Sequence, residues 1–474
     1  MADPLERPTD SLAALERVAA EAEGYLASLP TAPVRLRGSD EAAETFDGSL
    51  PEGGVGTLGA LDQLIEPGLD AHVRSSGPRF FHWVMGGATP AALGADWLAS
   101  LLDQNAGGWD ASPLASRLEL ICLRWLRELF ELPPEWDGVL VTGGQMANFT
   151  GLAAARQWWG ERHGIDVSAE GLASLPPTPV LTSGFIHVTG KKALAMLGLG
   201  GVRLTACADA TGAMDVAALE RELEALDGAP AIVIGNAGEV NTGLFDPLGE
   251  IADVCERYGA WLHVDGAFGL FARISPRTAA LTTGVERAQS VISDGHKWLN
   301  VPFDCGFAFV RDPQLLERTF AAGADYLPEA SDDRPIFAFR GPELSRRARS
   351  LAVWATLAAY GRSGYRAIVE RCLDNAARLA EQVEGSDDFE LLAPVPLNVV
   401  CMRYRPPGAA NGELDDLNER IGEAVLTDGR VYVGTTRWQG KVAFRPAFVN
   451  WRTTSGDVDL ILETLRDLGA RIRA

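Results

Sequence analysis

Between about residue 95 and residue 345, short apolar runs alternate with longer stretches whose apolar residues recur at helical spacing. The apolar runs are bounded by turn-forming residues and predict buried strands at 138–143, 178–183, 229–237, 260–267, 290–295 and 306–312. The stretches between them predict helices at 114–131, 146–160, 190–198, 215–226, 247–258 and 313–321. Strands that are apolar on both faces and alternate with helices are typical of an α/β domain, in which helices cover both faces of a mainly parallel sheet.

The two ends of the chain show different patterns. Residues 9–28 have apolar positions at helical spacing, and a Gly- and Pro-rich linker follows at 48–56. We therefore expect an N-terminal helical segment over 1–75, too thin to hold a core alone, that packs on another domain or subunit. The large α/β domain then covers 76–345. A smaller α+β domain over 346–474 is predicted by helices at 364–386, 412–427 and 456–473 and by strands at 397–404, 430–434 and 442–448.

Charge and cysteine spacing exclude several kinds of partner. The chain has 42 basic and 64 acidic side chains, a net charge of -22, which argues against binding to nucleic acid or an anionic membrane. The six cysteines show no CxxC spacing and no run of 18 apolar residues occurs, so we expect a soluble cytoplasmic protein. The six histidines show no metal-site spacing, and no GxGxxG turn follows a predicted strand, so we expect neither a metal nor a nicotinamide cofactor.

Two residues at predicted strand ends suggest cofactor chemistry. Lys297, one of four lysines, follows a buried strand in SVISDGHKWLN. Its amine can form a Schiff base with an aldehyde, which an arginine guanidinium cannot. Asp265 ends the preceding strand in WLHVDGAFG, where small residues leave room for a flat ring and a buried carboxylate needs a cationic partner such as a pyridinium nitrogen. Alone, each could be a surface lysine or a helix-capping aspartate; together they favour a cofactor site.

A glycine turn leads from a predicted strand into a helix in VTGGQMANFTGLAAAR. Backbone N–H groups at Gly144, Gln145 and the helix start are free to bind a phosphate, although such a turn can also serve tight packing. His187 follows another strand, from which its imidazole can lie over a planar cofactor or serve as an ordinary core histidine.

These residues, in this order, resemble the group II pyridoxal-dependent decarboxylases, the family of the aromatic-L-amino-acid and glutamate decarboxylases, which have the type I fold of PLP-dependent transferases. The resemblance covers about residues 70–450. It rests on PRFFHWV, GGWDASPLASRLE, TGGQMANFTGLAAAR, FDPLGEIADVCERYGAWLHVDGAFG, DGHKWLNVPFDCG and RRARSLAVWATLAAYG, and HVDGA followed by HKW is its most specific part. It implies pyridoxal 5'-phosphate (PLP) as cofactor, a small amino acid as substrate and an intertwined homodimer with shared active sites, whose N-terminal segment embraces the partner.

Carried to the matching positions, the resemblance implies a role for each site residue. Lys297 forms the Schiff base, Asp265 binds the ring nitrogen and His187 stacks on the ring. The phosphate lies at Gly144, Gln145 and His296, and Ala267 lies beneath the ring. Arg445, in VAFRPAF, lies near the substrate, and the aromatic residues expected at an interface pocket are Phe80, Phe81, Trp83 and Trp109.

Three positions depart from the family pattern. Gly238-Glu239-Val240 replaces the usual Gly-Thr-Thr, so we expect a polar contact with the ring from Asn241 or Thr242 instead. Asp294 stands where the aromatic enzymes often have Asn. Counting back from RRARSL, the mobile-loop position that usually holds a catalytic Tyr falls at Phe337, with Tyr326 as the alternative if the loop length differs.

The expected reaction is decarboxylation of an L-amino acid to an amine and carbon dioxide. Trp83 and Trp109 favour an aromatic substrate, although tryptophans in this region can equally be interface core. Because of Phe337, an aldehyde synthase that couples decarboxylation to oxidative deamination remains an alternative, as does a carbon–carbon lyase on the same fold. A catalytically silent PLP-binding protein is disfavoured by the full set of Lys297, Asp265 and His187.

Overall fold

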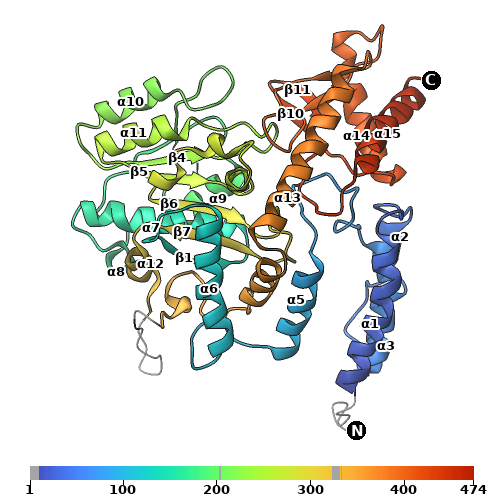
Figure 1. The fold of residues 1–474 in the computed structure, drawn as a ribbon, viewed down its shortest axis with the longest axis horizontal. Helices are drawn as coiled ribbons and strands as arrows, with labels where there is room; N and C mark the ends of the chain where they lie inside the picture. The colour runs from blue at the N-terminus through green and yellow to red at the C-terminus, as the bar shows by residue number, and fades with distance from the viewer. Residues whose placement is uncertain (1–9, 202–203, 323–330, 332–333) are drawn as a thin grey trace.

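The computed structural model describes residues 10–201, 204–322, 331 and 334–474. A large sheet covered by helices lies beside a smaller sheet with its own helices, and a group of N-terminal helices stands to one side (Figure 1). The boundaries predicted after residues 75 and 345 both fall in irregular segments. The division into three domains stays a prediction.

The large sheet has seven strands in the order β1-β7-β6-β5-β4-β2-β3. Neighbouring strands run parallel from β6 through β5, β4 and β2 to β3, whereas β7 is antiparallel to both β1 and β6. The mainly parallel sheet predicted from the sequence is therefore confirmed. Its strands are β1 Asp137–Val141, β2 Val180–Thr182, β3 Thr205–Ala206, β4 Ile232–Asn236, β5 Trp261–Asp265, β6 Ser290–Asp294 and β7 Gly306–Val310.

Helices cover both faces of this sheet because successive strand residues point to opposite sides. Ile232 and Ile234 of β4 belong to a buried cluster with residues of α7 and α9, while Val233 belongs to the cluster that contains α11. Figure 1 shows α10 and α11 on one side of the strands and α7 on the other. The helices are α5 Pro90–Leu102, α6 Pro113–Leu129, α7 Gly144–Arg162, α8 Val167–Glu170, α9 Val188–Met196, α10 Val216–Ala225, α11 Leu248–Tyr258 and α12 Pro313–Phe320, with 3-10 turns η1 Gly269–Ile274, η2 Ala279–Thr282, η3 Val285–Arg287 and η4 Phe337–Phe339.

The C-terminal part contains an antiparallel sheet in the order β10-β11-β9-β8. The helix predicted from residue 364 is the second half of the longer α13, which continues through a non-helical Gly361. Across the described ranges, no helix has both the length and the apolar character needed to cross a membrane. The elements are α13 Ser350–Glu384, β8 Phe389–Leu391, β9 Met402–Tyr404, η5 Asn411–Glu413, α14 Leu414–Asp428, β10 Thr435–Trp438, β11 Lys441–Phe444 and α15 Ser455–Arg473.

The strand predicted at 430–434 was wrong, because this segment pairs outside the small sheet. Tyr432 forms an isolated parallel bridge with Phe80. The N–H of Tyr432 donates to the carbonyl of Arg79 at 3.0 Å, and its carbonyl accepts from Phe81 at 2.9 Å. The PRFFHWV motif is therefore held against the C-terminal part of the chain.

The N-terminal helices form an arm, α1 Asp10–Ser28, α2 Ser39–Glu44, α3 Gly56–Ile65 and α4 Gly68–Ala71. α1 and α3 contain no buried residue, and Arg17 pairs with Asp62 across them at 2.7 Å. Several leucines of these two helices are exposed, among them Leu12, Leu58 and Leu64. Within one chain, the arm leaves much of its apolar surface uncovered.

Candidate active site

The predicted site residues lie at the carboxyl edge of the large sheet, where ligands bind in this fold class. Asp265 is the last residue of β5, and it pairs with Ile292 of the neighbouring β6. Lys297 follows the end of β6 by three residues. The N–H of Asp294 donates to the carbonyl of Ala267 at 2.9 Å, so the loops that follow the two strands are joined.

The Lys297 amine is paired with a carboxylate that the sequence predictions did not include in the site. Its Nζ lies 2.9 Å from Oδ2 of Asp294, and the two side chains are 15% and 4% exposed. The same Nζ lies 5.8 Å from the centroid of the Phe268 ring. The amine is therefore held over the loop that leaves β5.

The glycine turn, residues 143–145, lies directly beside this ion pair. The N–H of Gly144, the first residue of α7, donates to Oδ1 of Asp294. A Cβ on Gly144 would collide with Asp294, so only glycine fits there. Nε2 of Gln145 is buried and has no hydrogen-bond partner among the described residues. A buried, unpaired amide donor at a helix start suits a phosphate, as predicted for Gln145, whereas the N–H of Gly144 is used by Asp294.

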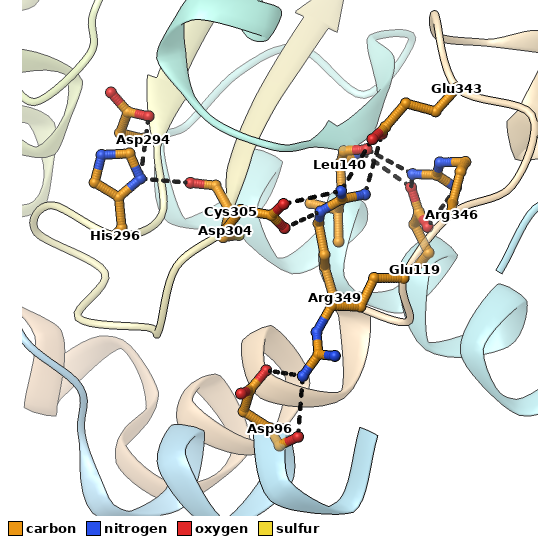
Figure 2. A network of polar contacts seen from close by, with 11 residues as sticks. Asp96, Glu119, Leu140, Asp294, His296, Asp304, Cys305, Glu343, Arg346 and Arg349 are labelled. Carbon is orange, nitrogen blue, oxygen red and sulfur yellow. Dashed lines mark hydrogen bonds and ion pairs between the residues drawn. The ribbon is translucent and has the colours of Figure 1, made fainter. Parts of the chain in front are cut away.

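His296 packs against the same turn. Its Nδ1 lies 3.1 Å from the carbonyl of Cys305 and 3.6 Å from Oδ1 of Asp294 (Figure 2), and its ring stacks on Phe303 at 4.2 Å. Burial lowers the pKa of His296, so the imidazole is neutral near pH 7. Because a carbonyl can only accept, Nδ1 carries the proton, and Nε2 remains an acceptor.

Two arginines of the RRARSL motif anchor the loop around the site. Figure 2 shows Arg349 between Asp304, at 2.7 Å, and Glu343, at 3.1 Å. Arg346 is 1% exposed and pairs with Glu119 at 2.7 Å, while it also donates to the carbonyl of Leu140. Asp304 directly precedes Cys305, whose carbonyl is the partner of His296. The ion pair of Arg349 with Asp304 therefore helps to fix the position of this carbonyl.

Asp265 is held by two neutral donors. Oδ1 accepts the N–H of Ala267 at 3.1 Å, and Oδ2 accepts Nδ2 of Asn148 at 2.9 Å. Asp265 is 8% exposed. Asn148 was not among the predicted site residues, although it lies one helical turn after Gly144, at the spacing that puts two residues on one face of a helix.

His187 is the N-cap of α9 and is oriented by its own turn. Its Nδ1 lies 2.8 Å from the hydroxyl of Thr189 and accepts the N–H of Thr189 at 3.3 Å. Burial lowers the pKa of His187. Asp265 and Asp294 oppose this shift, whereas Lys297 and Arg445 add to it, so the charged groups of the predicted site all act on one imidazole.

Arg445 follows β11 and is 8% exposed. Its Nη1 is buried and makes no hydrogen bond to any described residue. Burial lowers the pKa of Arg445, and Glu239 opposes this shift. An interior guanidinium with an unused donor is suited to bind a carboxylate of a ligand.

None of Lys297, Asp265, His187 and Arg445 lines the cavity of about 290 Å³ whose mainly apolar lining includes Phe80, Trp83, Tyr432 and Met85. The next residue, Gly86, donates its N–H to the carbonyl of His296 at 2.9 Å. Trp83 is 67% exposed and has a φ of 57°, and Val84 has a φ of 62°. Such φ values are costly for a β-branched residue, and strain of this kind is found at functional sites.

Two residues with predicted contacts have other partners within one chain. The amide of Asn241 donates to Glu239 at 2.6 Å and accepts from Thr436 at 2.7 Å. Phe337 is fully buried in the main core, with Arg346 lying 5.6 Å from its ring centroid. The contacts of Asn241 with the ring and of Phe337 with the substrate stay predictions.

The remaining predicted aromatic contacts have mixed outcomes. Trp109 donates its indole N–H to the carbonyl of Pro335 at 3.0 Å, and Arg117 lies 5.0 Å from its ring centroid. Within one chain, Trp109 therefore packs on the segment before η4, and its place in a substrate pocket stays a prediction. Tyr326, the alternative loop residue, lies outside the described residues.

Comparison with known proteins agrees with this geometry. The family model described as "Pyridoxal-dependent decarboxylase conserved domain" matches residues 53–405. The chain is 30% identical over 446 residues to the aromatic-L-amino-acid decarboxylase of Bacillus atrophaeus, covering 92% of this chain and 90% of the relative. It is 34% identical over 436 residues to the L-2,4-diaminobutyrate decarboxylase of Rhizobium meliloti (strain 1021), covering 88% and 84%. The crystal structure of Oryza sativa TDC with PLP and tryptamine has the same fold, with a TM-score of 0.90 at 24% identity over 100% of both chains.

Proposed function

The chain belongs to the pyridoxal-dependent decarboxylase family, and from this premise we propose that it converts an aromatic L-amino acid into its amine and carbon dioxide. That it is a PLP-dependent carboxy-lyase of amino acids follows from the family. We propose three further points: that the substrate has an aromatic side chain, that the product is an amine, and that each site residue has the role given below. The observation that carries the proposal is the meeting of Lys297, Asp265 and His187 at one sheet edge.

The residues at this edge fit PLP. The unpaired amide of Gln145 would hold the phosphate, and the N–H of Gly144 would join it by exchanging its bond to Asp294. Lys297 would bind the aldehyde carbon and Asp265 would face the ring nitrogen. Ala267 would lie beneath the ring. When bound, the cofactor supplies an electron-poor ring that takes up the electron pair left by departing carbon dioxide.

The chain's own groups orient the substrate and handle its protons. Arg445 would bind the α-carboxylate through its unused Nη1 and so fix which bond of the α-carbon faces the ring. His187 accepts hydrogen bonds at Nδ1, so its proton is held at Nε2. We assign that proton to the α-carbon after decarboxylation, with Tyr326 as the alternative donor.

Aromatic residues of the PRFFHWV segment support an aromatic side chain, because Gly86, which follows this segment closely, is hydrogen-bonded to His296 in the Lys297 loop. Phe80, Trp83 and Tyr432 offer rings for stacking.

We further propose that the enzyme works as a homodimer whose subunits share their active sites. Exposed leucines on the arm and on α5, among them Leu58, Leu64 and Leu101, need a partner surface. A cavity of about 460 Å³ separates the arm from α5 within one chain, lined by residues such as Tyr25, Leu69 and Trp97. The cytoplasm stays the proposed location, supported by six buried cysteines without disulfides.

A carbon dioxide release assay over aromatic, basic and acidic L-amino acids, with product identification, tests the proposal. We expect release from aromatic substrates with an equal amount of amine. Aldehyde with ammonia and hydrogen peroxide would identify an aldehyde synthase instead. Lys297→Ala should abolish release and the visible absorbance of the lysine-bound cofactor, whereas the exposed Lys192→Ala should change neither. Turnover by Lys297→Ala at the parent rate would refute the assignment.

A further inference from the structure

A chain of buried hydrogen bonds ends on the Asp265 carboxylate. The indole N–H of Trp261 donates to the hydroxyl of Ser290 at 3.0 Å, and this hydroxyl lies 2.8 Å from Nδ1 of His263. Nε2 of His263 lies 2.9 Å from Oδ1 of Asn148, whose Nδ2 donates to Oδ2 of Asp265 at 2.9 Å. His263 and Ser290 are 0% exposed and Asn148 is 1% exposed. The three central residues of this chain are therefore shielded from water.

The two ends of the chain determine the direction of every bond in it. An indole N–H can only donate, and a carboxylate can only accept. The amide of Asn148 must therefore turn its NH2 group to Asp265 and its oxygen to His263. His263 then carries its proton on Nε2, and Ser290 donates to Nδ1. Burial lowers the pKa of His263 to about 4, which keeps this imidazole neutral near pH 7.

The same amide reaches the second ring-facing residue. The other N–H of Asn148 donates to the hydroxyl of Thr189 at 3.2 Å, and this hydroxyl lies 2.8 Å from Nδ1 of His187. One amide thus supports the predicted ring-nitrogen partner and the predicted stacking imidazole. Both hydrogens of its NH2 group are used, so neither contact can be replaced by rotation of the amide.

The neutrality of this support has an electrostatic consequence. A cationic partner such as arginine would offset the negative charge of Asp265 before any ligand reached it. Asn148 and the N–H of Ala267 orient the carboxylate without adding charge. The full negative charge therefore remains available to a protonated ring nitrogen.

We propose that Asn148 is a positioning residue that aims Asp265 and His187 at the cofactor, and that neutral His263 holds the amide of Asn148 in the required orientation. The proposal rests on the PLP-dependent function above and deepens it. It assigns a purpose to three positions of TGGQMANFTG and HVDGA that touch no substrate: Asn148, His263 and Gly151.

Gly151 provides the space that this arrangement needs. It lies three residues after Asn148 on α7, and a Cβ there would come within 2.8 Å of Cε1 and 3.0 Å of Nδ1 of His263. Such contacts force the imidazole to move. Gly151→Ala therefore disturbs the chain of buried hydrogen bonds without removing any of its hydrogen-bonding groups.

The first test compares Asn148→Leu, which removes the three hydrogen bonds of the amide at similar volume, with Thr150→Val on the same helix. Thr150 is 0% exposed, and its hydroxyl bonds only within α7, to the carbonyl of Met146. We expect Asn148→Leu to weaken PLP binding about tenfold to a hundredfold, as for loss of a hydrogen bond to a charged group. The visible absorbance of the bound cofactor should also titrate at lower pH, because a misplaced carboxylate stabilises the protonated ring less.

Turnover separates positioning from general damage. Asn148→Leu should lower kcat and leave the KM for the amino acid nearly unchanged, since Asn148 lies behind Asp265. Thr150→Val should match the parent enzyme in PLP affinity, titration and kcat. If Asn148→Leu keeps the parent's PLP affinity and titration, or if both variants change alike, the proposal is overturned.

The second test examines His263. His263→Gln keeps a neutral donor for Asn148, and His263→Leu does not. We expect the absorbance of His263→Gln to titrate near the pH at which the parent titrates. The absorbance of His263→Leu should titrate at the lower pH expected for Asn148→Leu. That of Gly151→Ala should titrate at a pH between these two. Equal effects of Gln and Leu would exclude the orienting role. All these spectra require bound PLP but no decarboxylation, so they remain decisive even if the parent enzyme releases no carbon dioxide.

Discussion

Lys297 Nζ lies 2.9 Å from Oδ2 of Asp294, and the other oxygen of that carboxylate accepts the N–H of Gly144. One nearly buried acidic side chain therefore links the predicted Schiff-base amine to the predicted phosphate turn. The negative charge helps to hold the lysine. The same charge also repels a phosphate bound at the glycine turn, since a phosphate group carries a charge of about -2.

Asp294→Asn should therefore bind PLP more tightly, by about tenfold, because the repulsion is removed and the amide can donate to a phosphate oxygen. The measurement is a PLP titration of the apoenzyme followed by visible absorbance. Asp304→Asn is the control, since it removes the same charge from the same loop, where Asp304 contacts Arg349 instead of the glycine turn. Weaker binding by Asp294→Asn would mean that its hold on Lys297 matters more than its repulsion of phosphate.

The buried pair of Arg346 and Glu119 should make single and double substitutions behave differently. Arg346→Met leaves the Glu119 carboxylate, in a side chain that is 2% exposed, without its cation and should lower the free energy of unfolding by about 3–5 kcal/mol. The double variant Arg346→Met with Glu119→Leu should recover most of that loss. Urea unfolding of the apoprotein measures both.

A surface pair provides the comparison for this prediction. Arg378 and Asp459 lie 2.7 Å apart with side chains 45% and 43% exposed, so Arg378→Met should destabilise the protein far less than Arg346→Met. A double variant that is less stable than Arg346→Met would contradict the argument.

The neutral state of His263 predicts a pH dependence of stability. Burial lowers its pKa from 6.5 to about 4, so as the pH falls the unfolded chain binds the proton first. The stability that His263 contributes is complete above pH 6.5 and is lost between pH 6.5 and about 4. The difference of 6.5 minus 4 corresponds to about 3 kcal/mol.

In His263→Gln, the free energy of unfolding should accordingly fall about 3 kcal/mol less over this pH range than in the parent. Urea unfolding at several pH values measures the slope. His163→Gln, which removes an exposed imidazole, is measured alongside as the substitution control. An identical slope for His263→Gln and the parent would show that His263 binds its proton at the same pH in the folded and the unfolded protein.

The proposed dimer can be tested on the arm. Leu58→Glu combined with Leu64→Glu places two charges on the exposed surface of α3 and should shift the solution mass from dimer towards monomer, with loss of activity if the sites are shared. Leu50→Glu is the control, because Leu50 is 95% exposed and lies outside the helices. Light scattering measures the mass. A parent protein that is already monomeric would refute the proposal directly.

The sequence alone predicted the large sheet and the order of its chemistry. Strands such as 260–267 and 290–295 are apolar on both faces, a local pattern that survives in β5 and β6 with small shifts at their ends. Because parallel strands bring their carboxyl ends to one edge, Asp265 and Lys297 could be assigned to one site from their positions alone. The predicted family and cofactor were confirmed by the comparisons.

Other features were decided only by tertiary packing. The Asn148 contacts with Asp265 and His263 join residues 117 and 115 positions apart. Phe337 was assigned to the loop position by counting residues back from a motif. Such a count carries no information on burial, and the ring of Phe337 is buried in the core. Asn241 likewise turned to Glu239 and Thr436. Periodicity specifies which face of an element is buried, because it repeats along the chain; the partner of one polar side chain depends on the relative placement of distant elements, which no local pattern records.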